Sequence, residues 1–482
     1  MTLEKVLLIN PPFDVEWKGV TPPIGQGYLA ETLQSQGIDY DVFDMNLGYN
    51  FKQLCQKIDE TQPSLVGVGM ITRNFYEFYN LIGDIKKSYS HIKVIAGGPH
   101  VTIMKEQVLM ECLALDYGVV HEGEETLVEL CKGEKAISEI KGLLYRNGTG
   151  ISYSGDREYI RDLNQIPWPR YEKYELDKYF KEVNIFSSRG CPRRCIFCAR
   201  PVISALFRAR SAENVVDEIE YWYKKGYRQF NFEDDNFNLI KSRVFKICDE
   251  IEKRGLTGML IRCSNGIRAD RADRDILARM HEVGFRYLAI GVDAGNDRML
   301  EVIKKGETMD QIENAIKDAC ELGYSIKLFF VFGNPSETTK DVEDMAKLSL
   351  KYPISEAHFN TIIPYPGTEL YNWVQEKNYF LQSPEKFLND AAFMDINPIF
   401  ETPELPKEER VRLKKYLDKV RSEVHRRAVR RIFRNKYIGY FASIVVANSL
   451  FESLYYKNRI VRKIIERYRY TEPAGRPEEE VK

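Results

Sequence analysis

Three cysteines, Cys191, Cys195 and Cys198, stand close together with the spacing C-x3-C-x2-C. A structural zinc site would need a fourth cysteine or histidine, and the nearest histidines in the sequence, His121 and His281, are far away. A disulfide framework is typical of short secreted domains rather than of a 482-residue chain. Thiolates are, however, the usual ligands of iron–sulfur clusters. We therefore expect these three cysteines to bind a four-iron cluster and to leave one iron without a protein ligand.

The cysteine segment is also basic, because Arg189, Arg193 and Arg194 lie beside or between the first two cysteines. Two interpretations stay open. Either these guanidinium groups offset the negative charge of a thiolate-bound cluster, or they are solvated charges of an exposed loop. The other six cysteines are scattered, and most are expected to be buried thiols.

The net charge of −1 gives no reason to expect nucleic acid as a partner. The first residues enter a strand pattern directly and show no signal-peptide pattern. No uninterrupted apolar stretch reaches the roughly 18 to 20 residues of a membrane-spanning helix. We therefore expect a cytoplasmic protein, and reducing conditions there would suit an oxygen-sensitive cluster.

Residues 1–140 alternate short apolar runs with helical patterns, which predicts a doubly wound parallel sheet of the Rossmann or flavodoxin type. Ligands of such sheets bind beyond the carboxyl ends of the strands. The expected strands are Val6–Asn10, Tyr40–Asp44, Leu65–Ile71, Lys93–Ala96 and Tyr117–His121, and the expected helices include Ile24–Gln36, Phe51–Glu60 and Tyr76–Ser88.

The loops after these strands contain the glycines and polar side chains that a ligand site would use. Glycine lets backbone amides approach a ligand closely. A nucleotide site is disfavoured, because no G-x-G-x-x-G follows the first strand. The candidate binding residues are Asn10 and Pro12 after the first strand, Arg73 and Asn74 after the third, Gly97, Gly98 and His100 after the fourth, and Glu122, Gly123 and Glu124 after the fifth.

A second β/α series runs from about Val183 to Gln375 and again has polar residues at the ends of its expected strands. Its distinctive segments are Gln229–Phe237, Ile261–Asp270, Tyr287–Gly295, Phe329–Thr338 and Ile363–Leu370. The candidate site residues of this series are Phe197, Glu233, Asp234, Asp235, Asn265, Arg268, Asp293 and Gly333.

The cysteine motif, with Phe197 just before its last cysteine, and the five segments that follow it in order resemble the radical SAM superfamily. The N-terminal loops, placed ahead of such a motif, resemble the cobalamin-binding domain of cobalamin-dependent radical SAM proteins. This resemblance implies three cofactors: a [4Fe-4S] cluster on the cysteines, S-adenosylmethionine (SAM) at the open iron, and cobalamin on the N-terminal domain. It also implies a partial (β/α)6 barrel, open on one side, with its chemistry at the carboxyl ends of the strands.

Within this resemblance, the acids Glu233, Asp234 and Asp235 would hold the methionyl ammonium of SAM, and the alternative is an acidic patch at a helix N-terminus. Which acid touches SAM depends on the register of the strand. Asn265 would hold the ribose hydroxyls and Arg268 the carboxylate of SAM. The alternative for these two residues is loop polarity without a ligand.

One departure from the family concerns cobalt, because the D-x-H-x-x-G motif that supplies a histidine ligand is missing from the sequence. The cofactor would then be bound without a protein histidine, and His100 would shape its loop rather than bind metal. Arg73 or Asn74 would face the lower side of the corrin. Helix capping by Thr72 or Asn74 is the alternative for that loop.

The expected activity is reductive cleavage of SAM to a 5′-deoxyadenosyl radical, hydrogen abstraction from a substrate carbon, and methyl transfer from methylcobalamin. The first hypothesis is thus a C-methyltransferase. The second is a radical cyclase or other ring-forming enzyme that uses the same cofactors without net methylation. The third, a non-catalytic cobalamin sensor, is disfavoured by the intact cysteines. We expect a small-molecule substrate and an external one-electron reductant of the flavodoxin or ferredoxin type.

Residues 377–470 lose the β/α rhythm, and residues 406–470 contain 19 Lys or Arg against six Asp or Glu. Basic helices around the apolar run Tyr437–Phe451 are typical of interfacial helices, which predicts peripheral membrane contact and a lipid or isoprenoid-like substrate. The alternative is a helical cap on the barrel with a solvated basic face. The expected domains are 1–140 (cobalamin-binding), 141–180 (linker), 181–376 (radical SAM barrel), 377–470 (helical and basic) and 471–482 (disordered tail).

Overall fold

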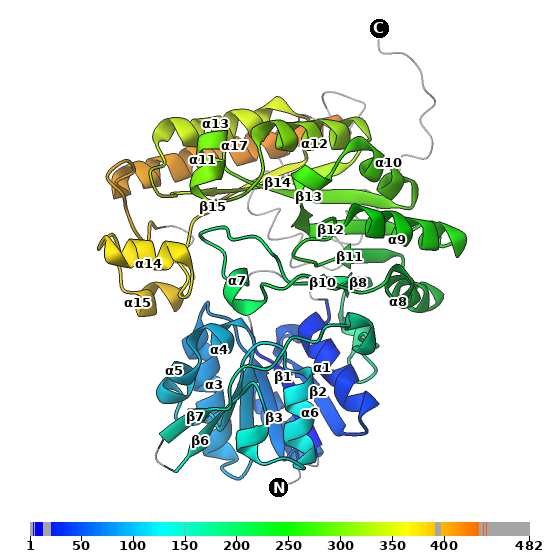
Figure 1. Cartoon of the computed structure of the whole chain (residues 1–482), viewed down its shortest axis with the longest axis vertical. Coiled ribbons are helices and arrows are strands. Elements are labelled where there is room, and N and C mark those ends of the chain that lie inside the picture. The colour runs from blue at the N-terminus through cyan, green and yellow to red at the C-terminus, as the bar shows by residue number, and fades with distance from the viewer. Residues whose placement is uncertain are drawn as a thin grey trace.

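The computed structural model describes Leu3, residues 5–12, 21–148, 150–390 and 397–432, and Tyr437 and Tyr440. The described residues form one sheet in the N-terminal part and a second in the central part, each with helices packed on it (Figure 1). Three expected features lie outside the described residues: most of the apolar run after Tyr437, the basic helix at 458–468, and the tail at 471–482.

The first five strands are parallel in the order β2-β1-β3-β4-β5, which confirms the predicted doubly wound sheet. This is the flavodoxin-like order. Alternate residues of β1 account for its two covered faces, because Val6 and Leu8 pack in one apolar cluster and Leu7 and Ile9 in the other. The elements are β1 (Lys5–Asn10), α1 (Ile24–Ser35), β2 (Asp39–Asp44), α2 (Phe51–Thr61), β3 (Leu65–Gly69), α3 (Phe75–Ser88), β4 (Lys93–Gly97), α4 (Pro99–Met104), α5 (Glu106–Glu111), β5 (Tyr117–Val119) and α6 (Glu124–Lys132).

The first sheet continues into residues that the sequence analysis placed in a linker. Strands β6 (Leu143–Asn147) and β7 (Gly150–Tyr153) form an antiparallel hairpin that extends the sheet beyond β5. The Arg146 side chain fastens this hairpin, since it donates to the carbonyls of Leu109 and Leu115 at 2.6 and 3.0 Å. Both strands are short and polar at the turn, so their alternation is too brief to stand out in the sequence.

The second sheet has six parallel strands in the order β15-β14-β13-β12-β11-β8, and its edge strands β8 and β15 do not pair with each other. This confirms the predicted open (β/α)6 barrel. Its elements are β8 (Glu182–Ile185), α8 (Ala212–Lys224), β11 (Gln229–Phe232), α9 (Lys241–Lys253), β12 (Leu260–Ile267), α10 (Arg274–Glu282), β13 (Phe285–Asp293), α11 (Asp297–Val302), α12 (Met309–Glu321), β14 (Ser325–Phe332), α13 (Thr339–Lys351) and β15 (Glu356–Thr361).

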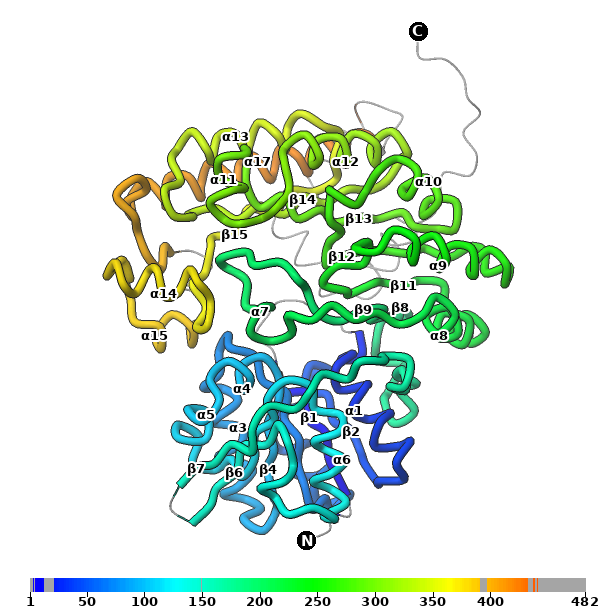
Figure 2. The backbone as a smooth tube through the Cα atoms, viewed as in Figure 1, coloured from blue at the N-terminus to red at the C-terminus, as the bar shows by residue number. Residues whose placement is uncertain are grey.

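A short antiparallel ribbon lies between β8 and α8. Its strands are β9 (Ser188–Arg189) and β10 (Arg208–Ala209), and helix α7 (Arg200–Ile203) lies in the loop between them. Figure 2 shows this loop between the two sheets, at the level where the N-terminal domain meets the barrel. The loop contains all three cysteines of the motif.

The C-terminal region is helical where it is described, as predicted. Helix α17 (Lys407–Ile432) packs against β15 and α13 and buries Leu413 and Leu417 on its inner side. Helix α14 (Glu369–Glu376) follows the barrel, and α15 (Pro384–Leu388) packs in the apolar cluster of the N-terminal domain through the fully buried Phe387. None of the helices among the described residues is both long and apolar enough to cross a membrane.

Candidate active site

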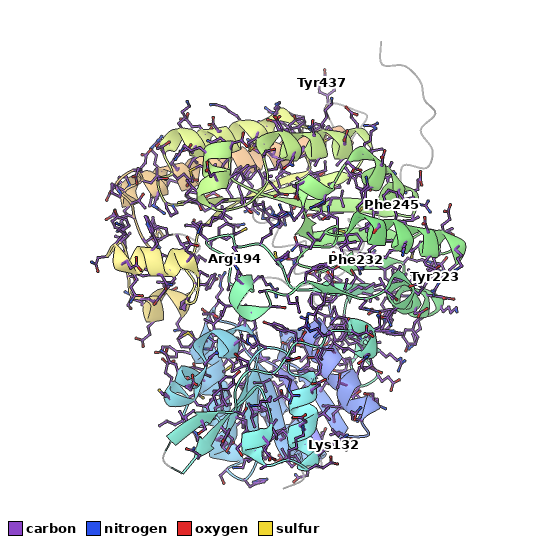
Figure 3. All side chains as sticks on the ribbon, viewed as in Figure 1. Lys132, Arg194, Tyr223, Phe232, Phe245 and Tyr437 are labelled. Carbon is purple, nitrogen blue, oxygen red and sulfur yellow. The ribbon has the colours of Figure 1, made fainter. Side chains whose placement is uncertain are left out.

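The three cysteines are free thiols, each partly exposed, in the loop between β9 and β10. Figure 3 labels Arg194 on this loop, between the N-terminal domain and the second sheet. The amide of Cys198 donates to the carbonyl of Cys195 at 3.1 Å, and the amide of Arg200 lies 3.4 Å from the Cys198 Sγ atom. An amide directed at sulfur favours the thiolate over the thiol.

These cysteines have the donor chemistry of an iron–sulfur cluster. Burial, together with the neighbouring Cys198 and Cys191, raises the pKa of the Cys195 thiol to about 11. A bound metal deprotonates such a thiol outright. Among the described residues, no three His, Cys, Asp or Glu side chains converge on one point where a single ion could be held. Thiolates are the usual ligands of iron–sulfur clusters, in which each thiolate binds a different iron.

The neck of the cysteine loop is closed by backbone contacts. The amide of Cys191 donates to the carbonyl of Ser204 at 3.1 Å. Gly190 has φ +86°, and a Cβ atom there would collide with the carbonyl of Leu206, so this position requires glycine. Within the loop, the carbonyl of Ile196 accepts a hydrogen bond at 2.9 Å from the amide of Leu370, which lies in α14.

Phe197, predicted to lie against the cofactor, is partly buried and packs against the apolar core. The loop arginines have different environments. Arg193 pairs with Asp270 at 3.2 Å, whereas Arg194 is exposed. The exposure of Arg194 fits a solvated loop charge, whereas Arg193 is engaged by an acid of the protein.

Asp234, one of the three acids after β11, is buried and faces the strand beside it. It accepts hydrogen bonds from the backbone amides of Ser187 and Ser188 at 2.6 and 2.8 Å, and from the Ser187 hydroxyl. Burial raises the pKa of Asp234, and the charge of Arg243 opposes that rise. Asp234 thus holds the residues that lead directly into the cysteine loop.

The other two acids face different partners. Asp235 pairs with Arg200 at 2.9 Å and accepts a hydrogen bond from the backbone of Gly190, so it also holds the cysteine loop. Glu233 accepts a hydrogen bond from the side-chain amide of Asn231. Burial raises the pKa of Glu233, and the neighbouring Glu182 raises it as well. A carboxyl in these surroundings gains from any cation that binds beside it.

Asn265 and Arg268 both contact main-chain atoms of neighbouring segments. The amide of Asn265 donates to the carbonyls of Glu233 and Asp234 at 3.2 Å each, which links the carboxyl ends of β11 and β12. Arg268 is buried, donates to Asp270 at 2.7 Å and reaches the Gly306 carbonyl at 3.1 Å. Its guanidinium is thus engaged by groups of the protein.

Asp293 lies beside a buried lysine that the sequence analysis did not propose as a site residue. Its φ of +64° is unusual for a residue with a side chain. Lys305 donates to Asp293 at 2.5 Å and lies 3.5 Å from Glu307. Burial lowers the pKa of Lys305, but these two acids outweigh burial and raise it, so the ammonium is charged next to Cys195. The sequence shows Lys305 before a glycine, and nothing there distinguishes it from an exposed lysine.

Gly333 makes room for a side chain from the C-terminal region. It has φ +96°, and a Cβ atom there would collide with the guanidinium of Arg410 of α17. Glu337 is fully buried and accepts hydrogen bonds from the amides of Gly333 and Asn334. Burial raises the pKa of Glu337 to about 7. The predicted cofactor loop after β14 is thus backed by α17.

On the N-terminal domain, Asn10 ends β1 and belongs to a hydrogen-bond network. Its side-chain amide donates to one oxygen of Asp44 at 2.9 Å, and the hydroxyl of Tyr179 donates to the other at 2.9 Å. Pro12 is exposed just beyond it. The end of the first strand is therefore tied to the segment that leads into the barrel.

The loop after β3 carries Arg73, which is partly buried, and Asn74. Asn74 has φ +56° at the start of α3, but its side chain forms no capping hydrogen bond, so the capping alternative fails for this residue. Its Oδ1 atom is buried without a hydrogen-bond partner among the described residues. A buried acceptor in this state fits a loop that contacts a ligand.

Gly97 is the last residue of β4, and Gly98 follows it. Gly98 has φ +110°, and a Cβ atom there would lie 2.5 Å from the carbonyl oxygen of Met70, so only glycine fits. His100 is fully buried, with Nε2 2.9 Å from the Tyr79 hydroxyl, and burial lowers its pKa to about 4. His100 is thus a neutral part of its loop's core, in agreement with the loop-shaping role.

Glu122 and Glu124 flank Gly123 after β5, and their carboxylates face the ribbon of the barrel domain. Glu122 accepts from Arg189 at 2.9 Å and from Arg208 at 2.8 Å, and Glu124 accepts from Arg189 at 2.6 Å. Burial raises the pKa of Glu122, but the two arginines outweigh burial and lower it. The sequence did not predict this contact between the domains.

Comparison with known proteins matches both parts of the chain. Residues 14–131 match the B12 binding domain, and residues 185–349 match the Radical SAM superfamily. The chain is 30% identical over 413 residues to an uncharacterized methyltransferase of Pyrococcus horikoshii, covering 83% of this chain and 88% of that relative. It is 26% identical over 393 residues to an anaerobic magnesium-protoporphyrin IX monomethyl ester cyclase of Cereibacter sphaeroides, covering 77% of this chain and 64% of the cyclase.

A solved structure with the same fold is that of OxsB, a cobalamin-dependent S-adenosylmethionine radical enzyme, with aqua-cobalamin and SAM bound. The TM-score is 0.76 at 16% identity, covering 97% of this chain and 75% of OxsB. The two domain matches occur in the order that the sequence motifs predicted, and they confirm the expected cofactor set of an iron–sulfur cluster, SAM and cobalamin. The chain therefore belongs to the cobalamin-dependent radical SAM family.

Proposed function

We propose that this enzyme is a C-methyltransferase that places its substrate between the open barrel and the N-terminal domain. The observation that carries the proposal is the position of the cysteine loop, which contacts acids of both domains. A relative that is 30% identical over most of both chains is named an uncharacterized methyltransferase. When bound, the cluster supplies the electron that cleaves SAM to a carbon radical, and cobalamin carries the methyl group.

We assign the cluster to Cys191, Cys195 and Cys198 and the methionyl ammonium of SAM to Glu233. Asp234 and Asp235 are already bound to the cysteine loop, whereas Glu233 is hydrogen-bonded to a neutral amide and lies near another acid. An ammonium group would relieve that repulsion. Glu233 would then orient SAM toward the open iron.

Four further residues act indirectly in this proposal. Asn265 positions Glu233 by binding its main-chain carbonyl, and Arg268 positions the segment at Gly306 that precedes Glu307. Lys305 keeps a positive charge next to Cys195, and Asp293 holds that charge in place. Lys305 thus places a positive charge beside the position that we propose for the negatively charged cluster.

For cobalamin, we propose the strand-end loops of the first sheet, with the backbone at Gly97 and Gly123 and the side chains of Arg73 and Asn74 facing the corrin. The buried, unpartnered Oδ1 atom of Asn74 supports this placement. From the extent of the two sheets, we propose domain limits of 1–155 for cobalamin binding, 156–180 for the linker and 181–376 for the barrel, with the C-terminal region beginning at 377.

A radical cyclase is the second candidate function. The observation that favours it is the 26% identity to a monomethyl ester cyclase, although this chain spans only 64% of the cyclase's length. The two reactions differ in product mass, because methylation adds one methylene unit to the substrate and cyclisation removes hydrogens. Mass analysis of the product decides between them.

Members of the radical SAM family act on small molecules with the help of an external reductant. For this chain we propose a lipid or isoprenoid-like substrate and peripheral membrane contact. The exposed basic residues Lys415 and Lys419 of α17 support the contact. Flotation with anionic vesicles at low salt tests it, and protein that does not float would refute it.

The test of the proposed function is anaerobic reconstitution with iron, sulfide and hydroxocobalamin. We expect about four irons and one cobalamin per chain, with iron lost in a C191A/C195A/C198A variant. Iron without cobalamin would rule out methyl transfer through cobalt. A chain that takes up no iron would refute the proposal as a whole.

A further inference from the structure

We propose that Glu122 and Glu124 are positioning residues for the cysteine loop, and that they couple the cobalamin site to the iron–sulfur cluster. The inference rests on the proposed function, since it concerns the same two cofactor sites. It adds a link between them that neither site needs in order to bind its own cofactor. The link consists of two acids of the N-terminal domain and two arginines of the barrel domain.

The two arginines lie opposite each other in the ribbon that forms the neck of the cysteine loop. Arg189 of β9 pairs in register with Arg208 of β10. Residues directly opposite in an antiparallel pair have their side chains on the same face, and like charges in such a pair repel each other. Arg189 is separated from Cys191 only by Gly190. Repulsion at this pair therefore acts on the neck of the loop that carries the cluster.

The neutralising charge comes from the other domain. One oxygen of Glu122 accepts from both arginines at 2.9 Å, and its second oxygen accepts from Arg208 at 2.8 Å. Glu124 adds a contact to Arg189 at 2.6 Å. The four side chains are 4% to 18% exposed, so water screens their charges only weakly.

Each of the two arginines also contacts an aromatic ring. The Arg189 guanidinium lies 5.0 Å from the ring centroid of Tyr28 in α1, and the Arg208 guanidinium lies 4.7 Å from that of Tyr159. Cation–π contacts of this kind strengthen when they are shielded from water. The carboxylates that neutralise the two arginines of the ribbon, and the rings that contact them, therefore lie outside the barrel domain.

The same loop after β5 is one of the strand-end loops proposed to bind cobalamin. Gly123 lies between the two acids and is the N-cap residue of helix α6. A ligand that fixes the backbone at Gly123 also fixes the two carboxylates that hold the ribbon. Coupling between two sites is reciprocal, so a cluster that fixes the ribbon must favour cobalamin binding by the same factor.

The experiment measures the dissociation constant of hydroxocobalamin for the full chain with and without the reconstituted cluster. For the unmodified chain we expect cobalamin to bind at least about fivefold more tightly when the cluster is present, the lower end of ordinary coupling. In the variant E122Q/E124Q the ratio of the two constants should fall to about one. Iron occupancy in the presence of a chelator should show the reciprocal effect.

The matched control is Glu125→Gln. Glu125 is the next residue of α6, and its carboxylate pairs with Arg157 at 2.9 Å, away from the ribbon. This control should keep the ratio of the unmodified chain. If E122Q/E124Q fails to fold, Arg189→Lys replaces it. A lysine is a single point charge that cannot bridge the two acids as the guanidinium does, so the ratio should fall at least by half.

The outcomes separate the inference from the function on which it rests. A chain that takes up both cofactors with equal cobalamin affinity in the two states overturns the coupling and leaves the proposed function standing. An E122Q/E124Q or Arg189→Lys variant that keeps the full ratio overturns the role of these side chains. A chain that takes up no iron or no cobalamin refutes the proposed function itself.

Discussion

Two acidic loops, one from each domain, hold the same cysteine loop by different means. Of the acids after β11, Asp234 binds backbone atoms, because it accepts hydrogen bonds from the amides of Ser187 and Ser188. The acids after β5 bind side chains instead, because Glu122 accepts from Arg189 and Arg208. The first arrangement lies within one domain and forms whenever the barrel folds. The second arrangement forms only when the two domains pack against each other, so it depends on how the domains are placed.

The largest expected effect is that of Asp234→Ala. This change leaves two buried amides without an acceptor and removes the carboxylate whose charge acts on the buried Arg243. We expect the free energy of unfolding to fall by about 3–5 kcal/mol, and iron per chain to fall with it. Denaturant unfolding and iron analysis of the reconstituted protein measure the two effects.

Asp235→Ala is the comparison for that variant. Its partner Arg200 is 41% exposed, so the loss should be only about 1 kcal/mol. An Asp234→Ala protein with unchanged stability and full iron content would show that the backbone contacts do not hold the loop.

A smaller effect is expected for Glu122→Gln, and here the nature of the contact can be tested directly. Because the partner is a side chain, a double-mutant cycle with Arg208→Gln isolates the pair. We expect a coupling energy of about 1–3 kcal/mol, as for other residues within one ionic network. Denaturant unfolding of the four proteins gives this value. Additive losses would mean that the domains meet without this contact.

Much of the fold follows from local sequence pattern. The five parallel strands of the first sheet lie within a few residues of their predicted limits, since each is a short apolar run between polar turns. The barrel follows similarly from its β/α rhythm. The hairpin of β6 and β7 was missed because two short strands with a polar turn leave no clear alternation.

In the site, the positions of the acids could be predicted from the sequence, but their partners could not. The acids after β5 and β11 were correctly expected at strand ends, because parallel strands place their carboxyl ends on one edge. Their partners were not predicted, because a partner such as Arg208 comes from a segment distant in sequence. The same holds for Lys305 beside Asp293 and for Arg410 above Gly333, where only the folded chain shows which charges are buried.

Glu122 and Asp234 should also differ in the direction in which their contributions to stability change with pH. The pKa of Glu122 is lowered, so its contribution is present above its usual value near 4.5 and is lost as the pH falls through the lowered value. The pKa of Asp234 is raised, so its contribution is present below about 3.8 and is lost as the pH rises through the raised value.

The stability of E122Q relative to the unmodified chain should therefore worsen as the pH rises from 3 to 6, and that of D234N should improve. Unfolding curves across this range measure both. If the two variants show parallel trends, burial and charge act on Glu122 and Asp234 in the same way, and the two acids do not differ as proposed.

The smallest effect on stability is expected at Gly97, the last residue of β4. A Cβ atom at Gly97 would lie an ordinary 3.6 Å from the Val119 Cβ atom, whereas one at Gly98 would meet the Met70 carbonyl. Gly97→Ala should therefore cost less than about 1 kcal/mol and keep the full iron content. It should still weaken hydroxocobalamin binding, because the new methyl group stands where we place the corrin. Gly98→Ala, by contrast, should destabilise the domain. Loss of iron in Gly97→Ala would show that this loop, too, reaches the cluster, and that the contact at Glu122 is not a special link between the domains.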